Sequence, residues 1–279
     1  MKKLLTELIP LFYGKLFNLT VILNPERTAT KAFDIFCTIR KGRVKPIQAT
    51  FLDKAKLTLE TIGDHKVQTY NWPGNGETIL LLHGWESNTF RWRNLIEKLK
   101  KKDYNIIAFD APAHGNSSGD RLHVPLYSIS SRFVMDKHQP KYIIAHSVGG
   151  MTTLYDHYVN PESSVKKIVT IGAPSEFSQF MDHYQNLLRF NDKVKNAMNK
   201  RLKEWLGFNF HEFSSAIFVS NNHKEGLLIH DMQDAQVPYE ASIKVHENWK
   251  NSKLVTTTGF GHSMHQEEVN NEIIEFLRS

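Results

Sequence analysis

Hydrophobic and polar positions follow two different periods along this chain. Over residues 1–23, large apolar residues recur every three or four positions, which predicts a helix. A second helix is predicted after Asn24, a suitable N-cap, with Pro25 at its first position. From residue 47 the pattern becomes strand-like, first over Ile47–Leu52 and then over His65–Trp72.

Short apolar runs and longer amphipathic segments then alternate. Strands are predicted at Thr78–Leu82, Ile106–Phe109, Tyr142–Ala145, Lys167–Ile171, Gly226–His230 and Leu254–Thr257. Helices are predicted around Asn88–Lys101, Pro125–Lys137, Val148–Tyr158 and Gln266–Leu277. Strands that alternate with helices form βαβ units. The pattern therefore predicts an α/β fold with a mostly parallel sheet and helices on both faces.

One interval, residues 175–215, is too long for a single crossover helix. It is helix-forming and rich in aromatic residues, namely Phe177, Phe180, Tyr184, Phe190, Trp205, Phe208, Phe210 and Phe213. We interpret it as a helical cap inserted over the end of the sheet. The expected organisation is an N-terminal helical extension (1–45), an α/β core (46–174 and 216–279) and the cap (175–215).

Charge is concentrated at the N-terminus. The chain has 279 residues and a net charge of +6, and residues 1–45 contain nine Lys and Arg against three acids. Glu7 interrupts the early apolar run, which argues against a signal peptide, and Lys15 and Pro10 argue against a spanning helix. The helix at residues 1–23 is expected either to pack on the body or to lie at a membrane surface or in a partner's groove.

Other composition features narrow the function classes. Cys37 is the sole cysteine, so no intramolecular disulfide forms and a cytoplasmic location is expected. The fourteen histidines show no metal-ligand spacing beside acids, so neither a metal nor another cofactor is expected. No nucleic-acid recognition motif accompanies the basic residues. The oligomeric state is left open.

The first motif with chemical meaning surrounds Ser147. The run Ala145-His146-Ser147-Val148-Gly149 lies between a predicted strand and a predicted helix. Such a sharp turn raises the central hydroxyl above the sheet edge, and it requires small residues two positions before and after the serine. An ordinary capped strand-to-helix turn is the alternative interpretation.

A second motif, Leu82-His83-Gly84-Trp85, follows another predicted strand. Acyl transfer needs backbone amides directed at a developing oxyanion. The amides of Trp85 and Val148 are the candidates for this oxyanion hole. His83 is expected to hold the loop by hydrogen bonds rather than to act as a base.

An acid and a base follow the last two predicted strands. Asp234 is preferred as the acid, whereas Asp231, nearer the strand end, is expected to bind loop amides. His262, which follows Gly261, is preferred as the base over His265, which is expected at the start of the final helix. Ser147, Asp234 and His262 each follow a predicted strand, at the edge where parallel sheets bind ligands.

With these motifs, residues 65–279 resemble the α/β-hydrolase superfamily, in its serine esterase and lipase-like branch. The run Asp110 to Ser117 is similar to the family's loop after the fourth strand, in which the position of His114 is structural. The resemblance implies an eight-stranded sheet and a cap after the sixth strand. Ala145 in place of glycine, and the N-terminal extension, depart from the basic pattern.

The expected reaction is hydrolysis of a carboxylic ester, with an apolar group, through an acyl-enzyme on Ser147. Asp234 would orient His262, the general base, and no cofactor would be needed. A thioesterase, an acyltransferase or a C–C bond hydrolase would use the same three residues. A non-catalytic binding module of the same fold is the alternative from another class.

Overall fold

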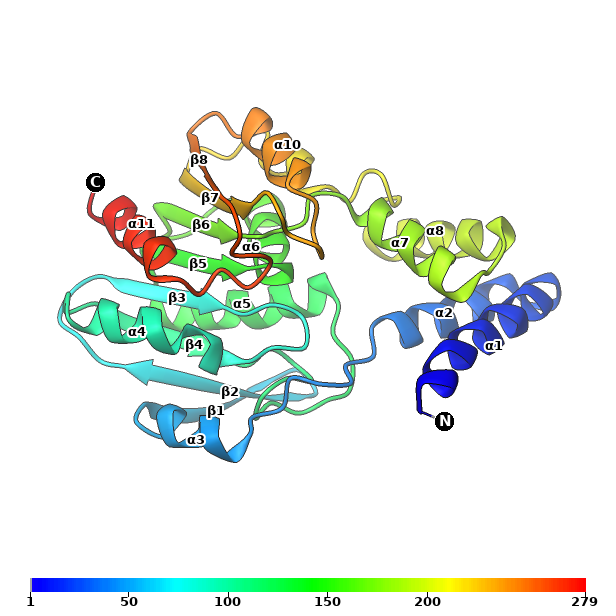
Figure 1. Cartoon of the computed structure of the whole chain (residues 1–279), viewed down its shortest axis with the longest axis horizontal. Coiled ribbons are helices and arrows are strands. Elements are labelled where there is room, and N and C mark those ends of the chain that lie inside the picture. The colour runs from blue at the N-terminus through cyan, green and yellow to red at the C-terminus, as the bar shows by residue number, and fades with distance from the viewer. Residues whose placement is uncertain (1) are drawn as a thin grey trace. The chain divides into compact units, whose positions relative to one another are not determined.

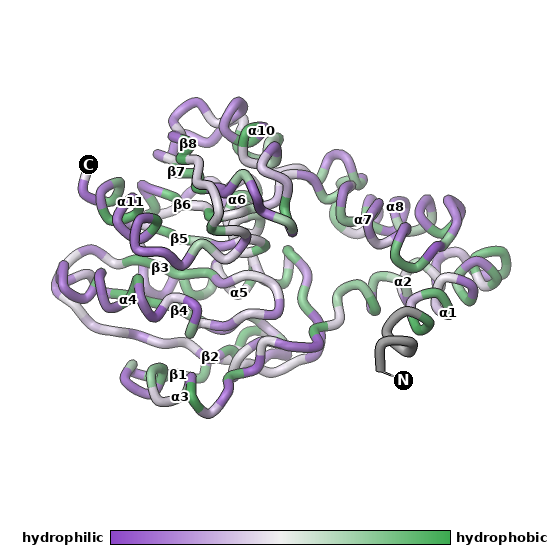
Figure 2. The backbone as a smooth tube through the Cα atoms, in the orientation of Figure 1, coloured by the Kyte–Doolittle hydropathy of each residue, from purple (hydrophilic) through white to green (hydrophobic). Residues whose placement is uncertain are grey.

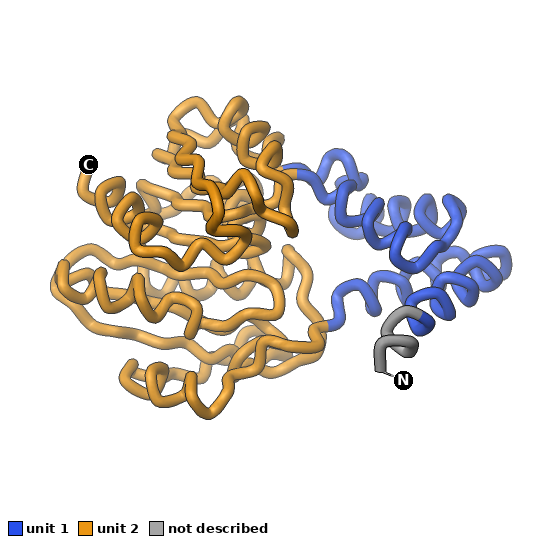
Figure 3. The backbone as a smooth tube through the Cα atoms, in the orientation of Figure 1, with its two compact units in different colours: residues 1–38, 176–214 blue, residues 39–175, 215–279 orange. Residues whose placement is uncertain are grey.

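The computed structural model describes the backbone of residues 2–279 and the side chains of residues 8–279. Leu4 and Glu7, which entered the expectation for the first helix, lie outside the described side chains. The chain forms two compact units (Figure 3). The helical unit comprises Met1–Thr38 and Glu176–Ser214, and the α/β unit comprises Ile39–Ser175 and Ser215–Ser279.

The α/β unit contains an eight-stranded sheet with the order β1-β2-β4-β3-β5-β6-β7-β8. The pairs β1–β2 and β2–β4 are antiparallel, and all the other pairs are parallel. The expected α/β class with a mostly parallel sheet is confirmed. The strands are β1 (Lys56–Ile62), β2 (His65–Trp72), β3 (Thr78–Leu82), β4 (Asn105–Phe109), β5 (Tyr142–His146), β6 (Lys167–Ile171), β7 (Glu225–Asp231) and β8 (Ser252–Thr257).

Helices cover both faces of this sheet, with α4 and α11 on one face and α5 and α6 on the other (Figure 1). The central strands are therefore buried and read as continuous apolar runs, as Leu80 to Leu82 illustrate. The helices are α3 (Pro46–Leu52), the 3₁₀ helix η1 (Thr89–Trp92), α4 (Arg93–Lys100), α5 (Val124–His138), α6 (Val148–Val159), α9 (Ser215–Phe218), α10 (Glu240–Asn248) and α11 (Glu267–Arg278).

The strand expected at Ile47–Leu52 is wrong, because this segment forms the helix α3. Pro46 occupies its first turn, and Gln48 accepts a hydrogen bond from the Lys45 amide through Oε1 at 2.9 Å. Proline and a capping side chain are helix-start signals that outweigh a short apolar run. The outer strand is instead β1, whose side chains are mostly exposed and which shows no apolar run.

The helical unit joins segments that are far apart in sequence. It contains α1 (Lys2–Leu23), α2 (Pro25–Phe36), α7 (Phe177–Leu188) and α8 (Asp192–Leu206). Their shared core includes Phe17, Ala32, Tyr184 and Met198. Most aromatic residues of the 175–215 interval pack in or against this core. A side chain at Gly14 would place its Cβ 1.7 Å from the Leu188 carbonyl oxygen, so α1 approaches the end of α7 too closely for any other residue.

Among the described residues, no helix combines the length and the apolar character that crossing a membrane requires.

Candidate active site

Ser147 lies in a sharp turn between β5 and α6. Its φ of 53° and ψ of −125° are unusual for a residue with a side chain, and such strain is typical of functional positions. A Cβ on Gly149 would lie 2.7 Å from the His83 carbonyl oxygen, and Ala145 is fully buried. The flanking residues must therefore be small, as the motif requires.

Three sequence-predicted residues meet at the C-terminal edge of the sheet. His262 Nε2 is 3.0 Å from Ser147 Oγ, and His262 Nδ1 is 2.7 Å from Asp234 Oδ2. Because the carboxylate can only accept, Nδ1 carries the proton and Nε2 is free to accept the serine proton. This arrangement has the connectivity of a nucleophile, a general base and an orienting acid.

Asp234 is buried but well supplied with hydrogen-bond donors. Its Oδ1 accepts the amides of Gln236 and Val237 at 2.8 and 3.0 Å. Burial alone would raise the pKa of Asp234, but hydrogen bonds from His230, His262 and these two amides hold that pKa well below its ordinary value. The carboxylate thus stays charged opposite His262.

Asp231 has the structural role expected from the sequence. Its carboxylate accepts the Phe260 amide at 2.9 Å, the Thr257 hydroxyl at 2.8 Å and the Gln233 amide at 2.9 Å. These contacts join the loop after β7 to the loop after β8. The carboxylate therefore fixes the two loops that hold Asp234 and His262.

The expectation for His265 needs a small correction. It lies in the loop two residues before α11, which begins at Glu267, and not in the helix. Burial lowers its pKa to about 4. No hydrogen bond connects it with Ser147 among the described residues.

The predicted oxyanion-hole amides belong to Val148 and Trp85. Val148 is the first residue of α6, so its amide has no acceptor within the helix. Gly84 packs against the turn so closely that a Cβ there would lie 3.0 Å from Ser147 Cβ. The described residues include no acceptor for the amide of Trp85, the next residue. Neither amide has a hydrogen-bond acceptor among the described residues.

Two buried histidines fix the loop that contains Trp85. His83 Nε2 accepts the Ala111 amide at 2.9 Å, and His114 Nε2 accepts the Glu86 amide at 3.0 Å. Both rings must be neutral to accept these bonds. Burial, the largest cause, lowers the pKa of His83 to about 4 and that of His114 to about 3. The structural roles expected for the two histidines are confirmed.

Sequence reasoning missed Gly172, which follows β6 with a φ of +55°. A Cβ at this position would lie 3.3 Å from His262 Nδ1, 3.4 Å from Asp234 Oδ2 and 2.9 Å from Met264 Cε. A glycine directly after a buried strand was the available signal. It leaves room for the contact between acid and base.

It also missed two side chains that hold the loop around His262. His146 Nε2 is 2.9 Å from the His262 carbonyl oxygen, and the Arg91 guanidinium donates to the Ser263 carbonyl at 3.0 Å. His146 Nδ1 is buried without a partner in the described structure, so Nε2 carries the proton and the ring is neutral. Burial lowers the pKa of His146 well below its ordinary value, which agrees with this tautomer.

A fourth missed residue, His230, contacts the acid. Its Nε2 is 3.0 Å from the Val237 carbonyl oxygen and 3.3 Å from Asp234 Oδ2, and its Nδ1 is 2.6 Å from Ser242 Oγ. The ring thus contacts the same carboxylate oxygen as His262 does. A histidine inside a buried strand, four residues before the acid, was the signal.

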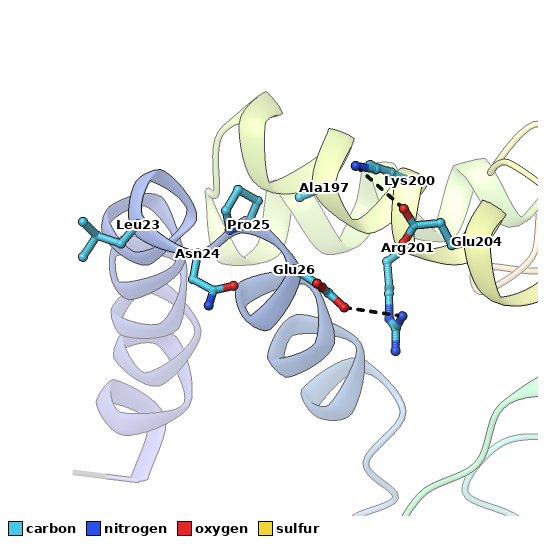
Figure 4. Close-up of a pocket in the computed structure, with 8 residues that line it drawn as sticks. All are labelled: Leu23, Asn24, Pro25, Glu26, Ala197, Lys200, Arg201 and Glu204. Carbon is cyan, nitrogen blue, oxygen red and sulfur yellow. Dashed lines mark ion pairs between the residues drawn. The ribbon is translucent and has the colours of Figure 1, made fainter.

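No metal centre competes with this site, since the described residues contain no group of three or more histidines, cysteines and acids placed to bind an ion. A separate pocket of about 320 Å³ lies within the helical unit, beside Pro25 and Ala197 (Figure 4). Two ion pairs cross its wall, Arg201–Glu26 and Lys200–Glu204. It contains none of the predicted catalytic residues.

Comparison with known proteins agrees with the fold. Residues 77–191 match the model of the alpha/beta hydrolase fold, and residues 213–279 match that of TAP-like protein. The first match includes Ser147, and the second includes Asp234 and His262. The chain belongs to the α/β-hydrolase superfamily. Its members of known sequence and structure can therefore be compared with it directly.

The uncharacterized hydrolase YugF of Bacillus subtilis is 24% identical over 75% of this chain and 92% of its own length. A serine hydrolase-like protein of Danio rerio is 33% identical over 46% of this chain, which spans only 42% of that relative. Among solved structures, the esterase EaEST from Exiguobacterium antarcticum superimposes with a TM-score of 0.63. It shares 16% identity over 81% of this chain and all of its own, so it shares the fold. The family models and the Bacillus subtilis relative indicate that the chain is a hydrolase.

Proposed function

We propose that this protein is a serine hydrolase that cleaves carboxylic esters through an acyl-enzyme on Ser147. The observation that carries the proposal is the continuous chain of contacts from Ser147 Oγ through the His262 ring to Asp234 Oδ2. A binding module has no use for a strained serine in contact with a neutral histidine and a buried carboxylate. The fold shared with the esterase EaEST lends support, as does the similarity to the serine hydrolase-like protein of Danio rerio.

The proposed reaction has two halves. In the first, Ser147 Oγ attacks the ester carbonyl while its proton moves to His262 Nε2, and the oxyanion accepts the amides of Trp85 and Val148. His262 then donates this proton to the leaving alkoxide, which departs as the alcohol. In the second half, water loses a proton to His262, attacks the acyl carbonyl, and releases the acid with Ser147 restored.

Asp234 acts in both halves without taking the proton. Its charge fixes the tautomer of His262 and stabilises the imidazolium that forms twice in each cycle. The two hydrogen bonds that backbone amides donate to Oδ1 prevent the carboxylate from rotating away. His146 and Arg91 hold the backbone of the base, so its ring remains directed at Ser147.

A fluorophosphonate probe tests the nucleophile directly. The folded protein should become labelled at Ser147, as read by peptide mass spectrometry, and Ser147→Ala should remain unlabelled. Ser263→Ala is the matched control, because Ser263 is exposed and adjacent to the base, and its labelling should equal that of the wild type. A folded wild-type protein that resists the probe would overturn the proposal.

A panel of p-nitrophenyl esters of increasing acyl length then tests the reaction class. Turnover that depends on Ser147 should appear, with a maximum at the chain length that the acyl pocket accommodates. Parallel assays with thioesters, and with an added alcohol as acyl acceptor, separate the thioesterase and acyltransferase alternatives. If Ser147 is labelled but no ester is turned over, the thioesterase or the acyltransferase replaces the esterase as the proposed function.

A further inference from the structure

The helix α1 has one face of large apolar side chains in solvent. These side chains are between 41% and 87% exposed and comprise Leu8, Ile9, Phe12, Leu16, Leu19, Ile22 and Leu23. At 100° per residue they fall within an arc of about 140°. Phe17 and Val21, on the opposite side, are buried in the core of the helical unit. Apolar residues thus recur along α1 (Figure 2), and one set of them is exposed while another is buried.

Basic residues outnumber acids on this face and next to it in the sequence. Lys15 is the one charged residue between Leu8 and Leu23, and it is exposed among the apolar side chains. Lys2 and Lys3 precede the face in sequence. Arg189 is exposed beside it, because its carbonyl accepts a hydrogen bond from Asn18 at 3.3 Å. The seven apolar side chains include no acid, and in residues 1–23 the three lysines outnumber the single acid, Glu7. An apolar face in a net basic segment matches an anionic lipid surface.

We propose that α1 lies in the interface of an anionic membrane, parallel to its surface. The seven apolar side chains, the α1 apolar face, enter the acyl region. Lys15 extends its aliphatic stem along them and places its ammonium among the lipid phosphates, as amphipathic side chains do at interfaces. Arg189 contacts the same layer from the start of the loop after α7.

The position of Lys15 argues against a second copy of the chain as the occupant. It lies midway along the length of the exposed face and within its arc, about 50° from the centre of the arc at 100° per residue. Two α1 helices paired along their full length would therefore place both Lys15 side chains in or beside an apolar contact. Burying like charges without partners is strongly unfavourable. A lipid leaflet instead supplies phosphates at the depth that a lysine side chain reaches.

The 279-residue protein can be tested by flotation with vesicles of phosphatidylcholine and phosphatidylglycerol (70:30) and with vesicles of phosphatidylcholine alone. The bound fraction should be larger on the anionic vesicles and should fall as salt is added. Phe12→Ser with Leu19→Ser should reduce the partition coefficient at least tenfold, and Lys15→Glu should remove most of the preference for anionic lipid. Ile47→Ser is the matched control, because Ile47 is 81% exposed on another helix.

Each outcome decides the proposal. Binding that is lost in the α1 variants, with thermal unfolding and the Ile47→Ser control unchanged, supports it. Equal binding by all variants overturns it, as does failure of the wild type to bind either vesicle. A wild type that is dimeric by light scattering, does not bind vesicles and becomes monomeric in Phe12→Ser with Leu19→Ser shows that a second copy covers the face. Turnover of a soluble ester, measured in parallel, keeps this result separate from the proposed reaction.

Discussion

The two units place polar and apolar side chains in opposite ways. In the α/β unit, charged and polar groups such as Asp231, Asp234 and His83 are buried, and each has hydrogen-bond partners. In the helical unit, α1 leaves large apolar groups in solvent. Buried polar groups are stable only when they are paired, so a cluster of them indicates a site inside the unit. A patch of exposed apolar groups indicates a surface that binds another molecule or a membrane.

The strongest test of this contrast compares two buried carboxylates of the α/β unit. Asp234→Asn should lower kcat by about 10⁴-fold, because the amide no longer holds the reactive tautomer of the base. Asp231→Asn should weaken folding more than turnover, since it only joins loops. Steady-state assays with a p-nitrophenyl ester, together with unfolding curves, measure both. If Asp231→Asn lowers kcat more than Asp234→Asn does, Asp231 and not Asp234 is the acid that orients His262.

The next test compares two phenylalanines on opposite sides of α1. Phe17→Ala should reduce the free energy of unfolding by about 3–5 kcal/mol, because it empties part of the helical core. Phe12→Ala should change it by less than about 0.5 kcal/mol, since that ring is 65% exposed. Urea denaturation gives both values. Similar losses would mean that the α1 apolar face is covered within the monomer.

Gly172→Ala tests how closely the acid and base must approach. The added methyl would crowd His262 and Asp234, so kcat/KM should fall by about 100-fold, as expected for a displacement of about 1 Å. Gly63→Ala is the matched control, because its φ is +54° but no atom lies within 4 Å of the added Cβ. If both variants keep full activity, Gly172 has no positioning role.

The smallest expected effect concerns the pH dependence of stability. The pKa of His114 is about 3 in the folded protein and about 6.5 in the unfolded chain, so below pH 6.5 the unfolded chain binds a proton that the folded chain does not. Stability should therefore fall with pH between 6.5 and about 3, by about 1.4 kcal/mol per pH unit from this group. His114→Gln should remove that part of the slope between pH 6 and 5, measured by urea denaturation. If stability depends on pH equally in the wild type and in His114→Gln, the His114 ring is not held neutral in the folded protein.

The sequence predicted most of the sheet because buried parallel strands appear as short apolar runs, as at Tyr142–Ala145. It failed at β1, whose exposed pattern carries no such signal, and at Ile47–Leu52, where capping outweighed hydrophobicity. Ser147, Asp234 and His262 could be predicted because each follows a strand. His146 and Arg91 could not, since each acts through a hydrogen bond to the loop around His262, which is distant in sequence.

The segment between Glu176 and Ser214 enters and leaves the fold at a single point. These two residues form an antiparallel bridge, and the Ser214 hydroxyl donates to the Glu176 carboxylate at 2.7 Å. Immediately outside them, the Ser215 amide donates to the Ser175 carbonyl at 2.8 Å. The break between β6 and β7 is therefore already closed in the α/β unit. Evolution or protein engineering can therefore replace this segment, together with the α1 and α2 residues that share its core, while Ser147, Asp234 and His262 keep their places in the α/β unit.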